Sequence, residues 1–134
     1  MGAGKQGMTR ARLGQYRILC RELALLEDRI KAQGYVSDSV RGSTTEPHYT
    51  EHAIKITGID AHAMRRLQRK RTAALQERAI IERYVDGVQD GMLRVLITAR
   101  YIRGASWAEV AKEAGGNNTR DGVRMMVKRF VDGR

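Results

Sequence analysis

The apolar residues of this chain recur at intervals of three and four, and this spacing constrains the fold more than any other feature. It is clearest in residues 13–34, where the series is Tyr16, Leu19, Leu23, Leu26 and Ile30. These intervals are typical of the a and d positions of a coiled-coil helix. Proline occurs once and aromatic residues make up 5% of the chain, so little interrupts helix formation. We therefore predict an all-α protein whose first long helix ends near Gly34.

A second long helix is predicted from about residue 60 to 84. Its apolar stripe is rougher, because Arg71 and Arg78 occupy positions where a strict seam would have apolar side chains. The stripe consists of Met64, Leu67, Ala74, Leu75, Ile81 and Val85. We expect this helix to pack antiparallel against the first.

The segment between the two long helices, residues 35–58, breaks the helical pattern. It is rich in Ser, Thr and Gly and contains the only proline, Pro47. Within it, His52, Ile54 and Ile56 alternate with Ala, Lys and Thr, which favours a short strand. We predict an irregular or short β insertion here, within a helical hairpin or oligomerisation region spanning residues 1–87. Residues 1 to about 9 are Gly-rich and are predicted to be a mobile end.

The charge of the chain indicates a polyanionic partner. Lys and Arg number 25 against 15 Asp and Glu, which gives a formal net charge of +10. Such a field favours nucleic acid first and an anionic membrane second. No apolar run approaches the length of a membrane span, and Cys20 is the only cysteine, which excludes an intramolecular disulfide. We expect a cytoplasmic protein.

The C-terminal region, residues 88–134, is predicted to be a helix-turn-helix DNA-binding domain. Ser106 and Glu109 form a capping-box pattern, and Gly115-Gly116 allows a sharp turn. A second helix near Thr119 to Phe130 follows, and its apolar stripe is predicted to be Val123, Met126, Val127 and Phe130. The alternative is a basic helical hairpin without base recognition.

In this interpretation, the start of the last helix faces bases and its flanks face phosphates. Arg120 and Arg124 lie one turn apart, so both can enter the major groove. Lys128 and Arg129 would hold phosphate, and the polar residues before the helix would bind phosphate at its N-terminus. The predicted DNA-binding residues are Asn117, Asn118, Thr119, Arg120, Arg124, Lys128 and Arg129.

The stretch "LRVLITARYIRGASWAEVAKEAGG" resembles region 4 of sigma-70-type factors, whose typical form runs from "RYxxG" to "SWxEIA" and then the recognition helix. The matching residues are Arg100, Tyr101, Gly104, Ser106, Trp107, Glu109, Val110 and Ala111. In layout, the whole chain is similar to small phage-encoded regulators of the RinA/ArpU type, which activate late or packaging-gene transcription. The resemblance implies a DNA-binding transcription factor of phage or prophage origin, with RNA polymerase as a further partner. The turn "GGNNTRDGV" is slightly longer than the one that region 4 usually has.

Two other classes of function stay open at this stage. A small terminase subunit, which recognises phage DNA for packaging, also joins a helix-turn-helix to helical oligomerisation elements. A module that binds an acidic protein through basic helices is the other. Homo-oligomerisation is compatible with all of these functions. No cofactor, metal site or enzymatic activity is expected, because His48, His52 and His62 complete no known metal-ligand spacing and no catalytic motif accompanies them. The basic run Arg65 to Arg71 is interpreted as a solvated helix face, with phosphate contact as the alternative.

Overall fold

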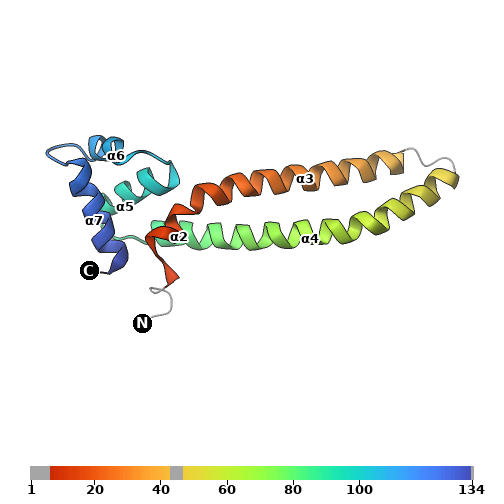
Figure 1. Ribbon diagram of the computed structural model, residues 1–134, viewed down its shortest axis with the longest axis horizontal. Coiled ribbons are helices and arrows are strands. Elements are labelled where there is room, and N and C mark those ends of the chain that lie inside the picture. Colours follow the sequence, from red (N-terminus) through yellow and green to blue (C-terminus); the bar gives the residue numbers. More distant parts are fainter. Residues whose placement is uncertain (1–6, 43–46, 134) are drawn as a thin grey trace. The chain divides into compact units, whose positions relative to one another are not determined.

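The computed structural model describes residues 7–42 and 47–133, with side chains over 7–33 and 61–133 (Figure 1). Every regular element in these ranges is helical, which confirms the all-α prediction. The elements are α2 (Arg10–Gly14), α3 (Tyr16–Gly42), α4 (Pro47–Asp86), α5 (Gly91–Ile97), the π-helical turn η1 (Thr98–Ile102), α6 (Trp107–Ala114) and α7 (Arg120–Asp132).

The chain divides into two compact units. The terminal unit combines Met1–Cys20 with Glu77–Arg134, and the middle unit is Arg21–Gln76. The long helices α3 and α4 therefore contribute to both units. The functional division predicted between residues 87 and 88 stays a prediction.

The irregular or β insertion predicted at residues 35–58 is wrong wherever the structure describes this segment. Helix α3 continues to Gly42 and α4 begins at Pro47, so the stretch from His52 to Thr57 is helical. Proline suits the first position of a helix, because its missing N–H would have no partner there. Extending an existing helix adds one hydrogen bond per residue, and this outweighs a short alternation of apolar residues. Residues 43–46 of the predicted insertion lie outside the described residues.

Part of the seam that the spacing predicted is buried in the middle unit. Leu23 and Leu26 of α3 are buried, as are Leu67 and Ala74 of α4. Arg71, which interrupts the apolar stripe of α4, donates from Nε to Oε2 of Glu27 on α3 at 3.1 Å. A charged residue is tolerated at this position because it is paired and partly solvated.

The terminal unit has a single aliphatic core drawn from both ends of the chain. Met8 is buried in it, so the mobile end predicted for residues 1–9 is wrong from residue 7 onward. Residues 1–6 lie outside the described residues. The largest fully buried side chains of this core are Leu13, Ile81, Leu96, Ile97, Val110, Val123 and Val127.

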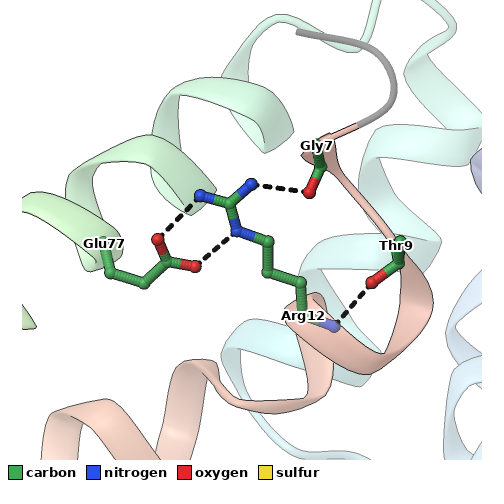
Figure 2. A network of polar contacts seen from close by, with 4 residues as sticks. All are labelled: Gly7, Thr9, Arg12 and Glu77. Carbon is green, nitrogen blue, oxygen red and sulfur yellow. Dashed lines mark hydrogen bonds and ion pairs between the residues drawn. The ribbon is translucent and has the colours of Figure 1, made fainter. Parts of the chain in front are cut away.

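A half-buried arginine connects α2 to α4 within the terminal unit (Figure 2). Arg12 donates from Nε and Nη2 to both carboxylate oxygens of Glu77, at 2.5 and 2.7 Å, and from Nη1 to the carbonyl oxygen of Gly7 at 2.6 Å. Its backbone N–H donates to Oγ1 of Thr9, the N-cap of α2, at 3.0 Å. The hydrogen bonds from Arg12 hold the pKa of Glu77 below its ordinary value. This two-pronged geometry is the strong form of an ion pair.

Two further contacts join the start of α3 to distant parts of the terminal unit. Tyr16 donates from its hydroxyl to Oε2 of Glu82 on α4 at 2.5 Å. Burial is the larger cause that raises the pKa of Tyr16, and this hydrogen bond is the second. Arg17 donates from Nη1 to the carbonyl oxygen of Arg103, just after η1, at 2.5 Å. The guanidinium thereby satisfies a carbonyl near the end of η1. Gly104 follows with φ of +79°, and a Cβ there would lie 1.6 Å from the same nitrogen of Arg17.

Replacing Glu77 with Gln is predicted to lower the free energy of unfolding by about 1–3 kcal/mol at neutral pH, because Arg12 loses a charged, two-pronged partner. The lowered pKa of Glu77 means that the pair's contribution is full above the ordinary value of 4.5 and is lost as the pH falls below it. Urea unfolding at several pH values measures the difference. Glu22→Gln, an exposed change on α3, should shift stability by less than about 0.5 kcal/mol; equal effects of the two changes would contradict this account.

Replacing Gly104 with Ala is predicted to destabilise the protein by about 1–2 kcal/mol, because a side chain is strained at positive φ and displaces Arg17. Gly14→Ala is the matched control, since a Cβ at that helical glycine meets nothing within 4 Å. That change should stabilise by roughly 0.5 kcal/mol through helix propensity. Thermal unfolding measures both variants, and we expect the unfolding temperature to fall for Gly104→Ala and to rise for Gly14→Ala. A change of the same sign and size in both variants would refute the role given to Gly104.

Candidate nucleic-acid interface

Helix α6 begins with the capping box that the sequence predicted. Oγ of Ser106 accepts from the backbone N–H of Glu109 at 3.2 Å, and Oε1 of Glu109 accepts from the backbone N–H of Ser106 at 2.9 Å. This second bond lowers the pKa of Glu109. Val110 and Ala111 point into the core of the terminal unit. The cap and the buried face together fix the start and the rotation of α6.

The connection from α6 to α7 is a tight glycine turn. Gly115 and Gly116 have φ of 75° and 61°, a region that L-residues with side chains rarely adopt. The side-chain amide of Asn118 donates to the carbonyl oxygen of Gly115 at 2.8 Å. Asn118 therefore shapes the turn, and its predicted phosphate contact stays a prediction. Asn117 lies exposed beside it.

Helix α7 is capped at both ends. Oγ1 of Thr119 accepts from the backbone N–H of Gly122 at 3.0 Å, so this predicted DNA-binding hydroxyl also serves as the N-cap. Gly133, in the left-handed conformation, ends the helix after Asp132. Oδ1 of Asp132 lies 3.2 Å from Nε of Arg10 on α2. The N-terminal end of α7 is thus closed by its own cap, and the C-terminal end contacts α2.

The buried stripe of α7 differs from the one predicted. Val123, Val127 and Val131 are buried at intervals of four, whereas Met126 and Phe130, predicted to be buried, are 37% and 38% exposed. The core-facing side of α7 is centred on the three valines, which places Met126 and Phe130 at its edge. Phe130 instead lies against Tyr84 of α4, with ring centroids 6.5 Å apart.

The first two turns of α7 present an exposed group of alternating charge. Arg120, Asp121 and Arg124 have side chains that are 68%, 72% and 48% exposed. Oδ1 of Asp121 lies 3.8 Å from Nε of Arg120 and 3.9 Å from Nη2 of Arg124. Exposed pairs at such distances contribute little to stability. The three side chains are therefore available to rearrange around a ligand, and we call them the Arg-Asp-Arg group.

Asp121 is the member of this group that the sequence prediction of DNA-binding residues lacked. The sequence spacing could have identified Asp121, because this residue adjoins Arg120 and lies three residues before Arg124 on one helix. Of the remaining predicted residues, Lys128 is half-buried and Arg129 is exposed further along α7.

Three residues that carry the family resemblance form a packed cluster between η1 and α6. Trp107 meets Tyr101 edge to face, with centroids 6.4 Å apart and an interplanar angle of 87°. Cζ of Arg100 lies 4.7 Å from the centroid of the Trp107 ring, a cation–π contact. Arg100 also donates to the carbonyl oxygen of Ala105 at 3.2 Å. This cluster positions α6 relative to η1.

Comparison of the chain with protein-family models, curated proteins and solved structures gives no match. Among the helices that the structure describes, none is long and apolar enough to cross a membrane.

Proposed function

We propose that this protein is a sequence-specific DNA-binding transcriptional regulator. Helices α6 and α7 would act as a helix-turn-helix, with α7 as the recognition helix in the major groove. The observation that carries this proposal is the exposed Arg-Asp-Arg group on the first two turns of α7. This helix is capped at both ends and packed through Val123, Val127 and Val131.

The packing and capping of α7 favour recognition of bases over sequence-independent attachment to the phosphate backbone. A helix with fixed rotation holds its outer side chains at fixed positions, and base recognition depends on such positioning. The exposed residues lie near the N-terminus of α7, the part of a recognition helix that approaches base edges. Arg124 is suited to guanine O6 and N7, which it can contact with two hydrogen bonds.

Asp121 supports base reading in a second way. A carboxylate in the first turn stabilises the N-terminus of a helix. Between two arginines it also weakens the attraction of phosphate, because it repels phosphate. A carboxylate in the major groove accepts a hydrogen bond from the N4 amino group of cytosine. The mixed charge of the Arg-Asp-Arg group therefore suits base edges better than a uniform phosphate backbone.

The long helices α3 and α4 would form an antiparallel pair that mediates dimerisation or contact with RNA polymerase. The buried seam of the middle unit and the ion pair between Arg71 and Glu27 support such a pair. The resemblance of residues 93–116 to sigma region 4 and the layout typical of RinA/ArpU regulators favour transcription as the process and a phage or prophage as the origin.

Arg124→Ala is predicted to weaken binding to the preferred site by roughly 10-fold or more, since a two-pronged contact to guanine contributes about 1–3 kcal/mol of discrimination. The preferred duplex is first selected from a random-sequence pool with the full chain, and fluorescence anisotropy then measures affinity for it and for a scrambled duplex. Arg83→Ala, which removes an exposed cation from α4 in the same unit, is the control. An equal loss on both duplexes for Arg124→Ala would remove its base-reading role.

The oligomeric state separates this proposal from a small terminase subunit. A regulator of this design is predicted to be a monomer or dimer in solution, whereas a packaging subunit assembles into a large closed ring. Light scattering coupled to size-exclusion chromatography, with and without the selected duplex, measures the mass. A ring of many copies would favour the packaging function over transcriptional regulation.

A further inference from the structure

Helix α4 carries a concentration of positive charge in the middle unit that the proposed base-reading surface does not use. Between residues 61 and 76 the sequence has five basic residues and no Asp or Glu. Residues 21–33 of α3, in the same unit, have three basic and three acidic residues. The positive charge of the middle unit is therefore concentrated on one helix.

Part of this helix forms a shallow groove on the surface. The groove is lined by Arg65, Gln68, Arg69, Thr72, Ala73 and Gln76. At about 100° per residue, these positions fall on the side of α4 opposite Leu67 and Ala74, the residues buried in the middle unit. Five of the six lining side chains have an N–H or O–H donor, and none is a carboxylate. We call this surface the α4 groove.

The arginines of the α4 groove differ from Arg71 on the same helix. Arg71 is paired with Glu27 at 3.1 Å. Arg65 and Arg69 are exposed, and among the side chains that the structure describes no carboxylate lies within ion-pair distance of either. Nη2 of Arg65 lies 3.5 Å from Nδ1 of His62. In the part of the chain whose side chains the structure describes, neither guanidinium is therefore paired with a carboxylate.

We propose that the α4 groove binds the phosphate backbone of nucleic acid without regard to sequence. Arg65 and Arg69 are one helical turn apart, about 6 Å along the axis. Each guanidinium matches a phosphate with parallel hydrogen bonds. The amides of Gln68 and Gln76 and the hydroxyl of Thr72 are side chains that commonly contact phosphate oxygens beside arginine.

The composition of the groove selects nucleic acid over an anionic membrane. A helix that binds a membrane surface pairs its basic residues with large apolar side chains that enter the lipid. Ala73 is the sole apolar side chain lining the α4 groove. A row of donors without an apolar component suits a hydrated phosphate backbone instead. This inference does not require α7 to read bases.

The test measures binding of the full chain to a scrambled DNA duplex by fluorescence anisotropy across a salt series. Arg65→Gln with Arg69→Gln should reduce the slope of log affinity against log salt by about 2, since each lost phosphate contact removes roughly 0.9. Arg21→Gln with Arg29→Gln, on α3 of the same unit, removes the same charge and should leave the slope nearly unchanged. Arg65→Lys with Arg69→Lys, which keeps the charge, should retain most of the slope.

Equal changes in slope for the two Gln pairs would overturn the inference, because net charge alone would explain them. No change in either pair would overturn it too. If the groove variant loses affinity for vesicles containing anionic lipid and keeps its DNA slope, the partner is a membrane and the inference fails. Gln has a helix propensity close to that of Arg, so far-UV circular dichroism should show unchanged helicity.

The same data separate this inference from the proposed function. If the wild type shows no sequence preference while the groove variant loses slope, base reading by α7 fails and the α4 groove stands. The variant Arg65→Gln with Arg69→Gln could instead keep the wild-type salt slope and a preference for the selected duplex. In that case the inference about the α4 groove fails and the proposed function stands.

Discussion

The terminal unit depends on arginines near the start of the chain that bind groups far along it. Arg12 pairs with Glu77, Arg17 binds the carbonyl oxygen of Arg103, and Arg10 pairs with Asp132. These contacts connect α2 and α3 to α4, to the end of η1 and to the end of α7. Arg12 and Glu77 are half-buried, so their charge-assisted hydrogen bonds are less screened by water than those of an exposed pair. The same segment contributes Met8 and Leu13 to the core.

This arrangement has a direct consequence for α7. Its C-terminal end is attached through Asp132, its middle is packed through three valines, and its N-terminal end is capped by Thr119. The Arg-Asp-Arg group therefore projects from the capped N-terminal part of a helix that is packed through Val123, Val127 and Val131. In the proposed mechanism this fixed geometry provides sequence reading at α7, whereas the α4 groove in the middle unit adds affinity for the backbone. The sequence preference should then come from α7, whereas the salt dependence should come from the groove together with the phosphate contacts predicted for Lys128 and Arg129.

The sequence predicted the helical class, the cap at Ser106 and the glycine turn, because each follows from contacts within a few residues. The seam of α3 and α4 was also predictable from spacing. The helical course of residues 35–42 and 47–58 was not, since composition favoured turns there and helix continuation prevailed. The burial of Met8 depends on contacts distant in sequence. So does the choice of Val131 over Met126 and Phe130 as the buried face of α7, because the direction of the core is set by α5 and α6. In the candidate site, Arg120 and Arg124 were predicted, and Asp121 was left out although its spacing to both arginines is local in the sequence.

The central claim is that the N-terminal part of α7, with the Arg-Asp-Arg group, reads bases. Its most direct test is the affinity of the wild-type full chain for duplex DNA from the neighbourhood of its own gene and for scrambled duplexes of the same composition, across a salt series. The account predicts that both affinities fall as salt rises and that a preference for the native DNA persists at physiological salt, because base contacts do not release counterions as phosphate contacts do. Equal affinity for both duplexes at every salt concentration would contradict it and would leave a basic helical protein that binds phosphate alone.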